Sequence, residues 1–187
     1  MSAGVTMSRH DDPVVSQAPA GRYDVIIIGA GMSGMYQLYR LRQLGLSVRA
    51  FEAGDGVGGT WYWNRYPGAR FDSESWTYGY SFSDELLREW EWSEHFAAQP
   101  ETLRYCNFVA DKLDLRRDIE FNSRIRAVAY DEAANQWEIE STEGRQARAR
   151  FLITAIGPLS APTMPTMPGI ESFRGESYHT GTWPHRP

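Results

Sequence analysis

The chain of 187 residues is 42% hydrophobic and 23% charged, which is typical of one globular domain, or of one domain and part of another. Its 19 basic and 24 acidic residues give a net charge of −5, which argues against a nucleic-acid partner. The single cysteine excludes a disulfide framework and a cysteine-based zinc site, and no apolar run approaches the roughly 18 residues of a membrane helix. We expect a cytoplasmic protein with no signal peptide and no membrane contact.

Residues 1–22, rich in Ser, Ala, Pro and Asp, predict a flexible tail. The β-branched run at 23–28 predicts a buried parallel strand. Apolar residues three apart over 32–44 predict a helix that ends at Gly45, and residues 46–52 predict a second strand. Strand, helix and strand within about thirty residues form a βαβ unit.

Further along the chain, the pattern changes several times. Residues 53–80 predict a long ordered loop, and helices are expected over 83–92, with Ser83 as N-cap, and over 100–115, with Leu103, Phe108, Val109 and Leu113 buried. Alternating apolar residues over 119–153 predict a small antiparallel sheet, and 151–157 another buried strand. The prolines after residue 157 indicate a linker.

The sequence Gly-Ala-Gly-Met-Ser-Gly joins the first strand to its helix. Gly29 allows a tight turn, Gly31 lets the backbone approach a diphosphate, and Gly34 lets the helix pack close to the sheet. The helix N-terminus offers free N–H groups to phosphates, and Ser33 adds a hydroxyl donor. Glu52 ends the next strand, where a carboxylate binds ribose hydroxyls and repels a 2′-phosphate, which favours FAD or NAD over NADP. A glycine-rich turn without a ligand is the alternative.

These features predict an α/β fold with a Rossmann-like domain over residues 23–157. In this domain a parallel sheet with helices carries a small antiparallel β-meander. Residues 158–187 are expected to be the linker that follows it.

Residues 58–72 read Gly-Gly-Thr-Trp-Tyr-Trp-Asn-Arg-Tyr-Pro-Gly-Ala-Arg-Phe-Asp. Adjacent glycines let the backbone approach a ligand, and flat aromatic side chains suit the wall of an isoalloxazine ring. An equal alternative is a surface loop whose aromatic residues fill the core and whose Arg70 and Asp72 form a solvated ion pair. Residues 173–184 contain His179 and Trp183, a combination that more often reflects packing than catalysis.

Taken together, these motifs resemble those of flavin-dependent Baeyer–Villiger monooxygenases, close to the phenylacetone and steroid monooxygenase group. The family carries the dinucleotide fingerprint, a long signature [AG]GxWxxxx[FY]P[GM]xxxD and a shorter FxGxxxHxxxW[PD]. Residues 58–72 and 173–184 fit these two signatures at every specified position. The resemblance covers residues 22–187.

The resemblance implies a reaction in which NADPH reduces FAD, and a flavin peroxide formed with dioxygen converts a ketone to an ester or lactone. It implies that Arg70 faces the nicotinamide nucleotide, that Asp72 orients a catalytic arginine, and that His179 has a conformational role. The cofactor-binding residues that it implies are Gly29, Gly31, Ser33, Gly34, Glu52, Gly59, Thr60, Trp61, Trp63, Asp72, Tyr78 and Ile125.

Family members continue into an NADPH-binding domain and a substrate region, whereas this sequence stops at Pro187. The resemblance therefore implies the FAD-binding portion of a truncated two-dinucleotide-binding-domain flavoprotein, with the NADPH-binding domain expected in the full-length protein. Two alternatives stay open: a flavin monooxygenase that oxygenates nitrogen or sulfur, and a non-catalytic FAD-binding module.

Overall fold

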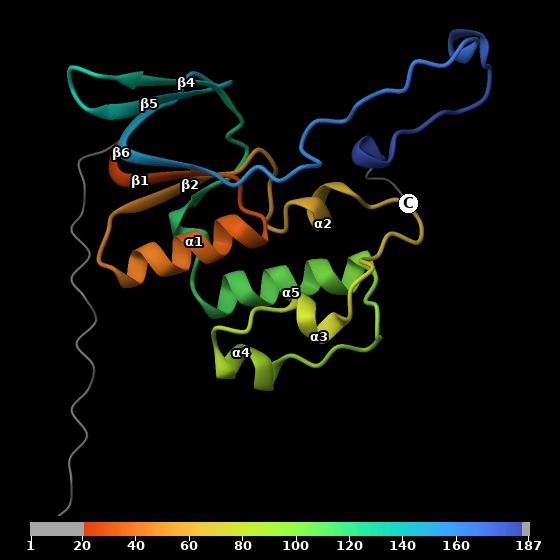
Figure 1. The fold of residues 1–187 in the computed structure, drawn as a ribbon, viewed down its shortest axis with the longest axis horizontal. Coiled ribbons are helices and arrows are strands. Elements are labelled where there is room, and N and C mark those ends of the chain that lie inside the picture. The colour runs from red at the N-terminus through yellow and green to blue at the C-terminus, as the bar shows by residue number, and fades with distance from the viewer. Residues whose placement is uncertain (1–20, 185–187) are drawn as a thin grey trace, which may run out of the picture.

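The computed structural model describes residues 21–184, so nearly all of the expected tail lies outside the described residues. Figure 1 shows a sheet with helices beneath it, a meander above it and an arm that projects from the sheet. The helices and strands are β1 (Arg22–Ile28), α1 (Met32–Gln43), β2 (Val48–Phe51), α2 (Thr60–Trp63), α3 (Ser75–Tyr78), α4 (Asp84–Glu89), α5 (Gln99–Lys112), β3 (Ile119–Glu120), β4 (Ile125–Asp131), β5 (Gln136–Ser141) and β6 (Gln146–Thr154).

The strands form one mixed sheet in the order β3-β2-β1-β6-β5-β4. Strand β1 pairs in parallel with β2 on one side and with β6 on the other, which confirms the Rossmann-like fold and the βαβ unit. Gly45 follows α1 with φ +75°, and Ser83 caps α4 by accepting a hydrogen bond from the Leu86 N–H, as the sequence predicts.

The residues expected to form a separate antiparallel sheet divide between two kinds of pairing. Residues Ile119 and Glu120 pair in parallel with Ala50 and Phe51, so their assignment to an antiparallel sheet was wrong. The chain returns from β2 through α5 before β3 begins, and such a crossover brings the next strand back in parallel. The expected meander is confirmed for β4, β5 and the first half of β6.

Strand β6 belongs to both layers of the fold. Its first half pairs antiparallel with β5, while its length from Arg148 to Thr154 runs parallel to β1. The meander thereby lies over the sheet face opposite α1 and α5 (Figure 1). A buried cluster fills the space between the two layers, formed by Ile26, Phe51, Ile139, Ala147 and Ala149.

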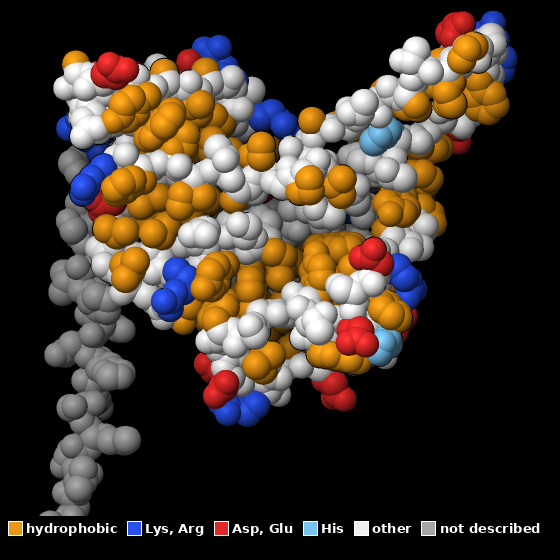
Figure 2. Space-filling view, viewed as in Figure 1, with side chains coloured by type: hydrophobic (Ala, Val, Ile, Leu, Met, Phe, Trp, Pro, Cys, Tyr) orange, Lys and Arg blue, Asp and Glu red, His pale blue; other side chains and the backbone are white. Residues whose placement is uncertain are grey.

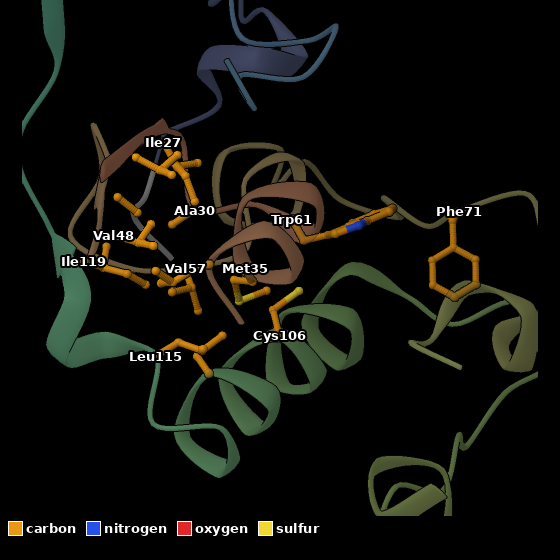
Figure 3. Close-up of a cluster of buried hydrophobic side chains, with 14 of the residues drawn as sticks. Ile27, Ala30, Met35, Val48, Val57, Trp61, Phe71, Cys106, Leu115 and Ile119 are labelled. Carbon is orange, nitrogen blue, oxygen red and sulfur yellow. The ribbon is translucent and has the colours of Figure 1, made fainter. Parts of the chain in front are cut away.

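A second core lies between the sheet and the helices (Figure 3). Ile27 and Val48 from the strands face Met35 of α1, and Cys106 of α5 lies beside Met35. Helix α5 buries Tyr105, Cys106 and Val109. The expected Leu103, Phe108 and Leu113 are only partly buried, because they flank the contact face.

The stretch expected to be a buried strand at 151–157 forms a strand only as far as Thr154 and is only partly buried. Strand β6 ends at Thr154, and Phe151 and Ile156 are 49% and 55% exposed. Phe151 pairs with Val25, but α1 lies over β1 and β2, so the Phe151 side chain is left largely uncovered within residues 21–184, whereas Ile153 packs against the core.

Residues 158–184 form the arm in Figure 1, which leaves the sheet after β6 and returns towards α2. The arm is mostly exposed, carries apolar side chains along its length (Figure 2), and contains two short 3₁₀ turns, Ile170–Ser172 and Thr180–Thr182. In the described part of the chain, no helix has the length and apolar character needed to cross a bilayer.

Candidate functional site

A cavity of about 410 Å³ lies at the carboxyl ends of β1 and β2. Strand β2, the next strand in the chain, lies on one side of β1, and β6, which comes much later, lies on the other side. Ligands of open α/β sheets bind at such a switch point in the strand order. The volume of the cavity falls within the roughly 300–1,000 Å³ that is typical of small-molecule sites. Four segments form its walls: the β1–α1 turn, the end of β2 with α2, the approach to β4, and residues from Ala155 to Thr182.

The β1–α1 turn forms the floor of this cavity and depends on its glycines. Gly29 has φ +103°, and a Cβ there would lie 2.6 Å from the Ala155 carbonyl oxygen. A Cβ on Gly34 would lie 2.0 Å from the Gly29 carbonyl oxygen, so a glycine is required for this turn to close. Gly31 is the N-cap of α1, and no side chain in residues 21–184 caps it, which leaves N–H groups beside the cavity.

The second wall rests directly on this turn. Gly59 has φ +53°, and a Cβ there would lie 2.8 Å from the Gly31 Cα. The Gly58 N–H donates to the Ala30 carbonyl oxygen at 3.0 Å. The glycine pair thus lets the start of α2 contact the N-terminus of α1, and Thr60 and Trp63 line the cavity above it.

Glu52 joins three segments at one end of the cavity. Its side chain is buried at 4% exposure, with one carboxylate oxygen accepting the Ala30 N–H at 2.7 Å and the other the Gly54 N–H at 2.8 Å. Its carbonyl oxygen accepts the Ser123 N–H at 2.8 Å. The residue predicted to bind ribose therefore lines the cavity and also holds its walls together.

Tyr62 connects α2 to the loop after Glu52. Its hydroxyl donates to an Asp55 carboxylate oxygen at 2.6 Å, and a Cβ on Gly54 would lie 2.6 Å from its ring. The Arg65 guanidinium lies 4.7 Å from the ring centroid on the Tyr62 side chain. Burial, followed by the hydrogen bond to Asp55, raises the pKa of Tyr62. Sequence reasoning assigned no role to this residue.

Comparison with known proteins places this geometry in context. An NAD(P)-binding Rossmann-like domain model matches residues 27–88. The chain is 49% identical over 90% of its length to the 2-oxo-Δ3-4,5,5-trimethylcyclopentenylacetyl-CoA monooxygenase of Pseudomonas putida, of which it covers 31%. It is 45% identical over 87% of its length both to a Baeyer–Villiger monooxygenase of Pseudooceanicola batsensis and to the phenazine N-monooxygenase of Lysobacter antibioticus, covering 30% of each.

Among solved structures, an oxidized steroid monooxygenase bound to NADP superposes with a TM-score of 0.81 and 52% identity. The match covers 88% of this chain and 32% of that chain. The chain matches the N-terminal portion of Baeyer–Villiger monooxygenases. It spans about a third of the length of these relatives.

The site residues implied by the resemblance to these monooxygenases divide into two groups. Seven line the cavity: Gly29, Gly31, Glu52, Gly59, Thr60, Trp63 and Ile125. Five do not line it: Ser33, which is exposed on the first turn of α1, Gly34, Trp61, Asp72 and Tyr78.

The aromatic residues of the Trp-rich segment divide between the cavity and the core. Trp63 lines the cavity, as expected of a ligand wall. Trp61 is 6% exposed and packs edge-on against Phe71, and its indole N–H donates to the Tyr78 hydroxyl at 2.7 Å. Burial raises the pKa of Tyr78. Trp61 and Tyr78 therefore belong to the core behind the wall.

Arg70 and Asp72 lie outside the cavity lining. Arg70 donates to a Glu94 carboxylate oxygen at 3.0 Å and to the Phe96 carbonyl oxygen at 2.8 Å, so its ion pair is with Glu94 and not with Asp72. The Asp72 side chain is exposed. Both residues are thus presented at the surface of the segment between α2 and α3.

Sequence reasoning missed several residues of the wall, among them Ser123 and Arg124 before β4, and Gly181 and Thr182 in the arm. The latter two come from the segment interpreted as a linker. His179 holds their turn, because its Nδ1 accepts the Gly181 N–H at 3.0 Å. The FxGxxxHxxxW motif was the available signal for this contact.

Proposed function

We propose that this chain forms the FAD-binding part of an NADPH-dependent Baeyer–Villiger monooxygenase, which converts a ketone to an ester or lactone with dioxygen. The observation that carries the proposal is the cavity at the switch point, whose walls are the glycine turn and the Thr60–Trp63 helix of the long signature. The 45% identity to a Baeyer–Villiger monooxygenase supports the same conclusion.

The residues of the cavity fit FAD. The uncapped N-terminus of α1 suits a diphosphate, and the close contact of Gly31 and Gly59 leaves backbone rather than side chains where the phosphates would pass. Glu52 would hold the adenosine ribose, and Trp63 and Thr60 would border the flavin. Ser33 would add a hydroxyl donor, Gly34 keeps the turn closed, and the backbone of Ile125 would meet the adenine.

When bound, the flavin supplies the redox and oxygen chemistry. The chain's own residues orient it, and Trp61 and Tyr78 support the wall from behind through their hydrogen bond. We assign Arg70 to the nicotinamide nucleotide and Asp72 to the orientation of a catalytic arginine outside this chain. An exposed carboxylate at Asp72 can fix the position of such a cation and offset part of its charge.

The remaining assignments concern the whole protein. We propose that residues 23–157 are the FAD-binding domain, and that 158–187 lead to an NADPH-binding domain in the part of the relatives that this chain does not span. The partners are a small ketone and dioxygen. Cys106 is buried and unpaired, which suits the reducing cytoplasm.

Nitrogen oxygenation is the second candidate function. The phenazine N-monooxygenase is as similar to this chain as the Baeyer–Villiger enzyme of Pseudooceanicola batsensis, at 45% identity over the same 87% of the chain. Identity over this stretch therefore does not separate ketone from amine substrates.

The test is to purify the full-length protein, with the NADPH-binding domain proposed beyond this chain, record its visible spectrum with FAD, and follow NADPH consumption with a cyclic ketone or a heteroaromatic amine. We expect flavin to bind, and ketone to give a lactone. Asp72→Ala should retain flavin and lose most oxygenation, whereas Glu132→Ala, an exposed change in the β4–β5 turn, should change neither. A protein that takes up no flavin refutes the proposal, and an N-oxide as the sole product favours the second candidate.

A further inference from the structure

Arg124 lies in the cavity wall and carries a side chain that the expected site did not include. The residue is exposed and lines the cavity beside Ser123 and Ile125. Its guanidinium forms no hydrogen bond or ion pair with any residue in 21–184, although the neighbouring arginine on β4, Arg126, pairs with Glu140. An arginine at a cavity without a carboxylate partner is available to a ligand.

The backbone around Arg124 is held in place from both sides. The Ser123 N–H donates to the Glu52 carbonyl oxygen and the Asn122 N–H to the Gly54 carbonyl oxygen, at 2.8 and 2.9 Å. The Arg124 carbonyl oxygen accepts the Thr142 N–H at 2.8 Å. Arg124 is therefore fixed next to Glu52, at the end of the cavity proposed for adenosine.

The position of Arg124 decides which part of the cofactor it meets. The diphosphate is expected at the N-terminus of α1, where Gly29 and Gly31 line the cavity. Glu52 is bonded to Ala30 on that side and to Ser123 on the other, so the ribose site separates Arg124 from the phosphates. The base would extend beyond the ribose towards Arg124 and Ile125.

We propose that the Arg124 guanidinium covers one face of the FAD adenine and contributes to cofactor affinity. The planar, delocalised guanidinium stacks on aromatic faces in a way that a lysine ammonium does not. Ile125, packed against the cluster between the sheet and the meander, would support the base from its own side of the cavity. This inference rests on the proposed FAD site.

The experiment measures the affinities of the purified protein for FAD, ADP and FMN by flavin fluorescence and competition. Arg124→Ala should weaken the binding of FAD and of ADP by about tenfold each and leave the affinity for FMN unchanged, because FMN lacks the adenosine. Arg124→Lys should have affinities similar to those of Arg124→Ala, since lysine keeps the positive charge but lacks the planar guanidinium group. The matched control is Arg126→Ala, two residues along and outside the cavity lining, which should bind all three as the wild type does.

Several results would overturn the stacking role while leaving the FAD site intact. One is wild-type FAD affinity in Arg124→Ala. Another is full rescue by lysine with a strong dependence on salt, which would assign Arg124 to the phosphates. Loss of FMN affinity along with FAD would mean that the substitution disturbs the whole cavity. A wild-type protein that binds no FAD would instead refute the proposed function.

Discussion

At the residue scale, the structure explains why some site residues could be predicted and others could not. Gly29 and Gly34 could be predicted, because the turn from strand to helix imposes a local steric demand that only glycine meets. The roles of Trp61 and Trp63 could not be separated, since side chains two residues apart on a one-turn helix point to different surroundings. Only the packed fold shows that one fills the core and the other lines the cavity.

Gly34→Ala tests the steric demand directly. The added Cβ would lie 2.0 Å from the Gly29 carbonyl oxygen, so the turn must open, and we expect the free energy of unfolding to fall by about 3 kcal/mol. Urea denaturation measures the change. Ser33→Ala places the same methyl group at the exposed neighbouring position and should leave the stability within about 0.5 kcal/mol of the wild type. Equal effects of the two substitutions would contradict the steric explanation.

At the scale of elements, local patterns predicted the strands and helices, while pairing depended on distant segments. The runs at β1, α1 and β2 were recognisable because each repeats the period of its own structure. The parallel pairing of the two-residue β3 could not be inferred, because it is set by the return of the chain through α5. The pairing of β6 with both β5 and β1 likewise leaves no local signal.

The β1–β2 junction provides a pH prediction. Asp24 accepts hydrogen bonds from the Ser47 N–H at 2.8 Å and the Ser47 hydroxyl at 2.7 Å, and the bond from the hydroxyl is the main cause of the lowered pKa of Asp24. A carboxylate whose pKa is lowered by folding stabilises the protein above its unfolded value near 3.8, and this contribution is lost as the pH falls further.

We therefore expect thermal stability to fall as the pH is lowered from about 5 to 3. Asp24→Ala should be less stable by about 2 kcal/mol at neutral pH and show a shallower fall on acidification. Thermal unfolding followed by circular dichroism at each pH measures both. A substitution that leaves the acid limb of the curve unchanged would show that Asp24 does not contribute to it, and Glu132→Ala serves as the exposed control.

At the scale of the whole molecule, the cavity is assembled from segments far apart in the sequence. The arm interpreted as a linker contributes Gly181 and Thr182 to the wall of the cavity. These residues come some 150 residues after the glycine turn, which forms another wall of the same cavity. The motif in the arm could be recognised, but its contact with the cavity depends on the path of the chain after β6.

His179 connects the arm to the site, and its substitution tests that connection. His179→Ala removes the acceptor for the Gly181 N–H and should weaken FAD binding by about fivefold, whereas His179→Asn can supply an oxygen acceptor and should recover most of the affinity. Flavin fluorescence titration measures the affinities. The exposed His95, which pairs with Glu74 away from the cavity lining, provides the control as His95→Ala. Equal losses in the alanine and asparagine variants would argue against a hydrogen-bonding role.

The shared strand β6 has a consequence for how this molecule loses its structure. The same β6 backbone forms hydrogen bonds with β1 on one edge and with β5 on the other. Loss of the β5–β6 pairing should therefore weaken the position of β6 beside β1. Amide protons of the β1–β6 and β5–β6 ladders should then exchange with solvent in a single cooperative opening, so that the two layers form and unfold together.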